Sequence, residues 1–197
     1  MAKIQWNPGT LLAPVPPVLV TCALGEEKNV LTIAWTGIVN SQPPKTYLSI
    51  RPSRHSYRMI WESGEFAINL TNTSLVRAAD WCGVYTGAKV DKFARCHLET
   101  EPASVIGCPL LAASPLSLEC KVTEIIPLGS HDLFLADIVA VDVEKSLVDP
   151  EGKLHLERAD LVAYAHGDYF ALGRALGSFG FSVAKKKPRS SQNQKRK

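Results

Sequence analysis

The longest regular pattern of hydrophobic and polar positions lies between residues 116 and 143. Over residues 116–123, apolar and polar side chains alternate at every position, the period of two that marks a strand with one buried and one solvent-facing side. Residues 133–143 form a second long apolar run rich in β-branched residues, and the polar segment 127–132 separates the two runs. The pattern therefore predicts two antiparallel strands joined by a loop.

Four shorter apolar runs precede this pair, and each is bounded by Gly, Pro, Asn or Ser, residues that commonly interrupt regular structure. They are residues 18–24, 30–39, 46–50 and 66–70. Together with the long pair, they predict about six strands.

Helical signals are fewer and unevenly spaced. Four short helices are expected: one capped by Ser53 or His55 and ended by Gly64, one capped by Thr73 or Ser74, one opened by Asp91, and one over residues 159–165. They do not alternate regularly with the strands, as a doubly wound sheet requires. The sequence therefore predicts a mainly β fold with inserted helices, an antiparallel Greek-key sheet closed into a barrel or split barrel that leaves few exposed edges.

Composition adds the class of protein. The chain has 197 residues, of which 46% are hydrophobic and 21% charged, values typical of a globular domain. No apolar stretch is long enough to span a membrane, and no secretory signal is recognised at the N-terminus. The five cysteines are odd in number and widely spaced, which favours reduced thiols in a cytoplasmic protein over disulfides or a zinc ribbon.

The net charge of +3 is distributed asymmetrically. Residues 185–197 contain seven basic residues and no acidic one, so the remainder of the chain carries a net charge of −4. We therefore divide the chain into one domain, residues 1–184, and a basic tail, residues 185–197, expected to be solvated and mobile, with contact to a polyanion as the alternative. The charge does not predict a nucleic-acid-binding surface on the domain.

One cluster of polar residues lies where a strand gives way to a helix. Arg51, Ser53, Arg54 and Ser56 supply guanidinium and hydroxyl groups beside the free N–H groups of a helix start, a combination suited to a phosphate. The alternative is that Ser53 only caps the helix and the arginines are solvated.

A second set of polar residues lies along the predicted strand at residues 30–39 and just before it. Asn29, Thr32, Trp35 and Thr36 combine amide, hydroxyl and indole groups that can form hydrogen bonds with the edge of a planar heterocycle. Trp35 has the alternative role of an ordinary core aromatic. Asn40 and Ser41 precede two prolines, where such residues also form turns for conformational reasons alone.

Other catalytic patterns are weak. The glycines in residues 83–89 are too closely spaced for a nucleotide-binding P-loop, and no Lys-Ser/Thr pair follows them. No Gly-x-Ser-x-Gly elbow occurs, and the five histidines show no His-x-x-x-His spacing, so neither a serine hydrolase nor a metal site is favoured. Cys82 is expected to be a buried apolar group.

Several longer motifs resemble the flavin reductase family, in particular its flavoredoxin branch. The similar segments include residues 32–44, 49–57 and 64–70, followed in the same order by residues 81–84, 90–93, 128–132 and 163–169. The resemblance covers most of residues 13–185. It implies an FMN-binding split β-barrel, a homodimer, and FMN held near the subunit interface.

The resemblance also implies which residues contact FMN. The leading expected contacts are Asn29, Trp35, Ser56 and Lys92. The remaining expected contacts are Thr32, Thr36, Asn40, Ser41, Arg51, Ser53 and Arg54. His131 has two alternative roles, orienting a nicotinamide or bonding only to its own loop.

The activity implied by the resemblance is that of an oxidoreductase without a catalytic nucleophile, because the flavin carries the chemistry. Reducing equivalents pass from NADH or NADPH, through bound FMN, to free flavin, ferric iron or a protein acceptor. The first alternative is an electron carrier of the flavoredoxin type, reduced by a partner protein without nicotinamide turnover. The second is a flavin-binding module without turnover.

Overall fold

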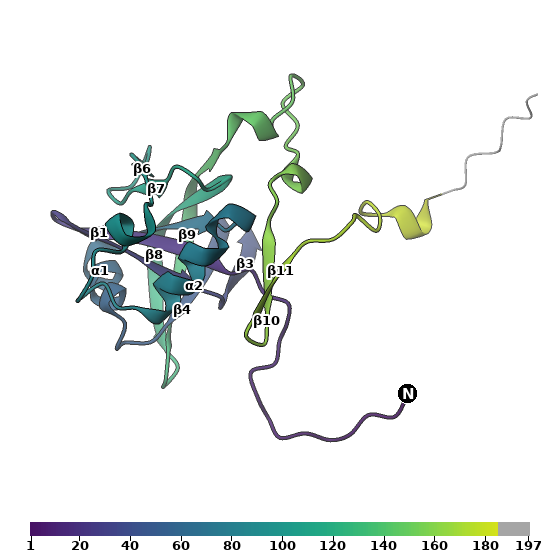
Figure 1. The fold of residues 1–197 in the computed structure, drawn as a ribbon, viewed down its shortest axis with the longest axis horizontal. Helices are drawn as coiled ribbons and strands as arrows, with labels where there is room; N and C mark the ends of the chain where they lie inside the picture. The colour runs from purple at the N-terminus through teal and green to yellow at the C-terminus, as the bar shows by residue number, and fades with distance from the viewer. Residues whose placement is uncertain (185–197) are drawn as a thin grey trace, which may run out of the picture.

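The computed structural model describes residues 1–184 and is dominated by one seven-stranded antiparallel sheet (Figure 1). The expectation of a mobile basic tail concerns residues 185–197, which lie outside the described part. The sheet has the order β2-β1-β5-β8-β9-β4-β3. Its strands are β1 (Val18–Leu24), β2 (Glu27–Ile33), β3 (Thr36–Ser41), β4 (Pro44–Ile50), β5 (Glu65–Leu70), β8 (Leu116–Pro127) and β9 (Asp132–Val143).

The connection between the two outer strands closes this sheet. β2 and β3 lie at opposite ends of the strand order, yet only Ala34 and Trp35 separate them in sequence. Because three residue steps span at most about 11 Å, Ile33 and Thr36 must lie close together, and the sheet must curve until its edges meet. The predicted antiparallel barrel architecture is confirmed.

The prediction of about six strands is too low, since residues 1–184 contain eleven. The run at residues 30–39 forms two strands rather than one, because the chain passes from one sheet edge to the other at Ala34 and Trp35. Two small pairs add four strands: β6 (Thr100–Glu101) with β7 (Leu110–Leu111), and β10 (Val162–Ala165) with β11 (Asp168–Ala171). Strands of two to four residues are too short for an alternating pattern to identify them.

The helices are α1 (His55–Ser63), α2 (Val76–Val84) and α3 (Lys92–Cys96), with 3₁₀ turns η1 (Thr73–Leu75), η2 (Lys145–Leu147), η3 (Leu156–Arg158) and η4 (Phe181–Val183). Gly64 ends α1 as predicted, at a φ of 68° that favours glycine. Asp91 caps α3 by accepting a hydrogen bond from the Ala94 N–H, also as predicted.

Three of the helix predictions are wrong in detail. The N-cap of α1 is Arg54, without a side-chain cap, so neither Ser53 nor His55 has that role. The second helical segment is capped by Asn72, whose side chain accepts from the Leu75 N–H, because Thr73 and Ser74 already lie inside the 3₁₀ turn. Residues 159–165 contain no helix; the last four residues form β10, which pairs with β11.

Two apolar clusters hold the helices on the sheet. Met59 and Ile60 of α1 pack against strand residues that include Phe66 and Phe134, all buried. Leu19 and Val30 face the other way and contact α2 and α3. Strand β2 therefore lies between α1 on one side and the α2–α3 pair on the other. This arrangement places the polar residues of β2 near the start of α1 and near the segment that joins α2 to α3.

The cysteines are free, and four of the five are buried in this interior. Burial raises the pKa of Cys22 to about 11 and those of Cys82 and Cys120 to about 12, so these thiols stay protonated near neutral pH. Cys82 is therefore a small buried group, as expected, rather than a nucleophile.

Both ends of the described chain extend away from the barrel (Figure 1). Residues 1–12 and 172–184 are exposed throughout and carry large apolar side chains. These are Met1, Ile4, Trp6, Leu11, Leu12, Leu172, Leu176, Phe179, Phe181 and Val183. We call these two segments the N-terminal and C-terminal arms.

Among the described residues, no helix has the length and apolar character required to cross a membrane.

Candidate functional site

A polar cavity of about 380 Å³ lies between β2, the start of α1 and the segment from the end of α2 to α3. It collects seven of the predicted site residues: Asn29, Thr32, Arg51, Ser53, Arg54, Ser56 and Lys92. The other lining residues are Leu31, His55, Cys82, Gly83, Tyr85, Thr86 and Gly87. We call this space the cationic cavity because of its three basic side chains.

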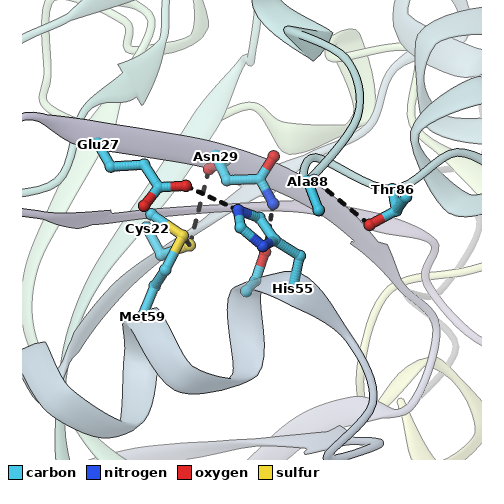
Figure 2. A network of polar contacts seen from close by, with 8 residues as sticks. Cys22, Glu27, Asn29, His55, Met59, Thr86 and Ala88 are labelled. Atoms are coloured by element: carbon cyan, nitrogen blue, oxygen red, sulfur yellow. Dashed lines mark hydrogen bonds and ion pairs between the residues drawn. The ribbon is translucent and has the colours of Figure 1, made fainter.

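A buried hydrogen bond joins two walls of the cationic cavity. The Asn29 amide Nδ2 on β2 donates to Ser56 Oγ in the first turn of α1 at 2.7 Å, and both residues are almost completely buried. Figure 2 shows Asn29 above the helix that carries His55 and Met59, with His55 Nε2 in contact with Glu27 Oε1 at 2.7 Å. These contacts fix the start of α1 against β2 and hold Ser56 in the cavity wall.

Positive charge in the cavity comes from Arg51, Arg54 and Lys92, none of which forms an ion pair within residues 1–184. Lys92 is only 3% exposed, and its Nζ donates to the Cys82 carbonyl at 2.8 Å. Burial lowers the pKa of Lys92, and the nearby Arg54 adds to this effect. A buried ammonium with no acidic partner is stabilised by an anion, so this geometry fits a phosphate.

The segment at residues 83–87 contributes a wall that the sequence analysis missed. Gly83, Thr86 and Gly87 all line the cationic cavity, although residues 83–89 lack P-loop spacing. A Cβ at Gly87 would lie 2.3 Å from Asn29 Oδ1, so only glycine allows the loop to approach this closely. The available sequence signal was a pair of glycines shortly before Asp91 and Lys92.

A second cavity of about 150 Å³ adjoins the first and shares Thr32, Arg51 and Arg54 with it. We call it the aromatic cleft, because the rings of Trp35 and His131 lie there with centroids 4.7 Å apart and planes 38° from parallel. Trp35 is 41% exposed, so its interpretation as a core aromatic is wrong. The cationic cavity and the aromatic cleft are therefore neighbours, with Arg51 and Arg54 lining both.

His131 enters the aromatic cleft from the loop before β9. Its Nδ1 lies 3.0 Å from Ser130 Oγ. Burial lowers the pKa of His131, and the positive charges of Arg51 and Arg54 lower it further. The imidazole is therefore neutral at physiological pH, with one nitrogen able to donate and one able to accept a hydrogen bond.

The structure does not bring three of the predicted contacts to either cavity. The Thr36 hydroxyl donates to the Tyr47 carbonyl, and the Asn40 amide donates to the Pro43 carbonyl at 2.8 Å. Ser41 pairs with Pro44 at the tip of the β3–β4 hairpin. All three contacts lie within the β3–β4 hairpin, and for Asn40 and Ser41 this is the conformational role that the turn composition also allowed.

The sequence matches the family model described as flavin reductase like domain over residues 11–173. An uncharacterized protein of Aeropyrum pernix is 32% identical over 132 residues, which are 66% of this chain but only 50% of that protein, so the match spans about half of that relative's length. The NADPH-flavin oxidoreductase of Streptomyces viridifaciens is 26% identical over 146 residues, 72% of this chain and 74% of that protein.

Solved structures show the same architecture. The flavoredoxin of Desulfovibrio vulgaris (Miyazaki F) superposes with a TM-score of 0.86 and 31% identity, covering 93% of this chain and all of that one. Component B of the nitrilotriacetate monooxygenase of Bacillus cereus gives a TM-score of 0.80 at 22% identity, over 90% of this chain and all of that one, a likeness in fold. With the family model covering most of its length, the chain belongs to the flavin reductase-like family and has that family's split-barrel fold.

Proposed function

We propose that this protein binds FMN in the adjoining cavities and transfers reducing equivalents from NADH or NADPH through it to an acceptor such as free flavin, ferric iron or a redox protein. The observation that carries the proposal is that the two spaces adjoin. A cavity with three basic side chains, none of them paired with a carboxylate within residues 1–184, lies next to a cleft with Trp35 and His131 and shares three lining residues with it. A ligand with an anionic end and a planar aromatic end matches this arrangement.

The residues present fit the phosphate of such a ligand. Lys92 and Arg54 supply charge, and Ser56 supplies a hydroxyl held in place by Asn29. Arg54 is itself positioned by donating to the Gly83 carbonyl at 3.2 Å. Charge-assisted hydrogen bonds from these groups are stronger than neutral ones, so they account for retention of a dianionic phosphate.

The aromatic cleft fits the ring system. When bound, FMN accepts a hydride or electrons and passes them on, and the protein sets its position and polarity. Trp35 and the neutral His131 provide an uncharged aromatic wall, while Arg51 and Arg54 provide positive charge at its edge. Positive charge near the ring favours the reduced, more negative state of a flavin.

The similarity to a flavoredoxin favours a second candidate, an electron carrier that a partner protein reduces. Both candidates require a bound flavin, so they differ only in the electron donor. Neither needs a nucleophilic side chain from this chain.

The two candidates are separated by stopped-flow mixing of the FMN-loaded protein with NADH or NADPH under anaerobic conditions. Rapid loss of the oxidised flavin absorbance identifies the reductase. No loss with either nicotinamide, together with fast reduction by a reduced redox protein, identifies the carrier. A purified protein that is colourless and takes up no added FMN contradicts both.

We also infer that the protein is a homodimer. The two arms expose ten large apolar side chains, and a monomer rarely exposes so many on segments that leave its core. A second copy of the chain is the partner that fits, because each copy carries the same two arms and can exchange them with the other. The five free thiols are in keeping with a cytoplasmic location.

A further inference from the structure

A hollow adjoins the cationic cavity and has no role in the function proposed above. It measures about 600 Å³ and is open to solvent. Its lining residues are Trp81, Tyr85, Val90, Asp91, Ala94 and Arg95. Tyr85 lines both the hollow and the cationic cavity, so the two spaces adjoin at this residue.

An aromatic stack forms one side of this hollow. The rings of Trp81 and Tyr85 lie 4.3 Å apart and 21° from parallel, and the Arg95 guanidinium lies 5.8 Å from the Trp81 ring. Trp81 packs against the buried cluster around Leu19 and Val30, which anchors the stack. Tyr85 is 50% exposed, so part of its side chain remains accessible to a ligand beside this stack.

Helix α3 connects the hollow to the cationic end of the cavity. Its first residue, Lys92, reaches inward to the Cys82 carbonyl, whereas Ala94 and Arg95 face the hollow. Lys92 and Arg95 are three positions apart on this helix, so an anion held by Lys92 lies about one helical turn from a second cation. The acidic group in the hollow, Asp91, is partly engaged because its carboxylate accepts the Ala94 N–H at 3.0 Å.

We propose that this hollow is a subsite for the adenosine phosphate half of a dinucleotide, with the adenine on Tyr85 and a phosphate oxygen at Arg95. Purine rings stack on exposed aromatic side chains, and arginine is the preferred partner of phosphate. The proposal rests on the proposed function, since the other half of the dinucleotide is either the flavin itself, in the cavity assigned to FMN, or a nicotinamide beside the bound FMN. Two ligands share this chemistry: FAD, bound in place of FMN, and NADH or NADPH, bound beside it.

The first experiment uses the apoprotein and isothermal titration with FMN, FAD and 5′-AMP. If FAD is the source, FAD binds more tightly than FMN, and Tyr85→Ala and Arg95→Ala each reduce that preference. Loss of one stacked base corresponds to a fall of about 5- to 150-fold in affinity. Arg95 lies outside the cationic cavity, so Arg95→Ala leaves the affinity for FMN unchanged.

The second experiment uses the FMN-loaded protein and compares NADH with reduced nicotinamide mononucleotide, which lacks the adenosine half. If NADH or NADPH is the source, 5′-AMP inhibits competitively, and Arg95→Ala raises KM for NADH but not for the mononucleotide. Tyr85→Phe keeps the stacking and behaves as the wild type. Trp61→Ala is the matched control, because this exposed aromatic residue lies on α1 and lines neither cavity nor the hollow.

The outcomes separate this inference from the proposed function. Binding of FMN without preference for FAD, combined with no effect of 5′-AMP or Arg95→Ala in either experiment, overturns the adenosine subsite and leaves the FMN site standing. Failure to bind FMN overturns the proposed function. In that case 5′-AMP binding to the apoprotein, weakened by Tyr85→Ala, still reports on the hollow alone.

Discussion

Lys92 offers the most direct test of the cationic cavity. Its side chain is 3% exposed and, within residues 1–184, has one hydrogen-bond partner, the Cys82 carbonyl at 2.8 Å, and no carboxylate paired to it. A hydrogen bond to a charged group contributes about 1.5–3 kcal/mol. The Lys92→Met variant keeps most of the side-chain volume and removes the charge, so the FMN dissociation constant is expected to rise about 10- to 150-fold.

The stability of the apoprotein is expected to respond differently. Burial opposes the charge of Lys92, as its lowered pKa indicates, so methionine relieves that penalty while it removes one hydrogen bond to a carbonyl. The free energy of unfolding of the apoprotein should therefore fall by no more than about 1 kcal/mol. This contrast distinguishes a binding residue from a structural one.

The assay is quenching of FMN fluorescence on titration with apoprotein, paired with urea unfolding of the same samples. Lys89→Met serves as the control, because this lysine is exposed and does not line the cavity. Equal FMN affinity in the wild type and in Lys92→Met would refute the assignment of the phosphate to this cavity. A large loss of apoprotein stability would instead show that Lys92 mainly supports the fold.

The pH dependence of FMN binding is a second test of the role of Lys92. The cationic form of Lys92 attracts the phosphate, so its contribution is present below its pKa and is lost as pH rises through it. Because burial lowers the pKa of Lys92, this loss begins at a lower pH than an exposed lysine would give. The alkaline decline in affinity should be absent from Lys92→Met.

Four other changes have defined outcomes. Gly87→Ala should weaken FMN binding about tenfold, since the new Cβ would lie 2.3 Å from Asn29 Oδ1, and an unchanged fluorescence titration would show that the loop can yield. Glu119→Gln should lower the free energy of unfolding in urea by about 2–4 kcal/mol, because this buried carboxylate accepts four hydrogen bonds from a neighbouring loop; a loss below about 1 kcal/mol would contradict that. Hydrogen bonds to two carboxylates raise the pKa of His155 in the folded protein. The protonated imidazole therefore stabilises the fold below the unfolded-state pKa of about 6.5, and this stabilisation is lost as pH rises through the folded-state pKa. The melting temperature of His155→Gln should therefore be lower than that of the wild type at about pH 6 and equal to it at about pH 9. Equal melting temperatures of variant and wild type at both pH values would exclude the charge effect. Sedimentation of the FMN-loaded protein should give twice the 21.5 kDa of one chain, and removal of residues 1–12 should shift it toward the monomer; a wild-type monomer would count against the arms as dimer contacts.

Local signals in the sequence determined several elements of this fold. The alternation at residues 116–123 correctly marks β8 as a strand. Over these residues its polar face is exposed only at Lys121 and Thr123, because neighbouring segments cover Ser117 and Glu119 and bury them. Gly64 ends α1 and Asp91 begins α3 through hydrogen bonds within a few residues of each. Such signals can be read from one segment because the groups involved are neighbours along the chain.

The predictions of secondary structure were wrong where a local pattern was compatible with two structures. Residues 30–39 appear as one apolar run, and their division at Ala34 and Trp35 follows only from the need to cross between the two sheet edges. Residues 162–165 have a helix-compatible pattern but pair with residues 168–171 instead. Pairing with a distant or adjacent strand outweighed local propensity in both cases.

For the site, the sequence by itself determined the chemistry, namely basic, hydroxyl and aromatic groups in segments that resemble a flavin-binding family. Only the tertiary structure decided which of those groups meet. It brought Asn29, Ser56 and Lys92 into one cavity and left Thr36, Asn40 and Ser41 on a hairpin outside it. It also added the wall at residues 83–87, whose place opposite β2 depends on how α2 packs on the barrel. Cavities form between elements that are distant in sequence, so their walls are set by packing and not by any single segment.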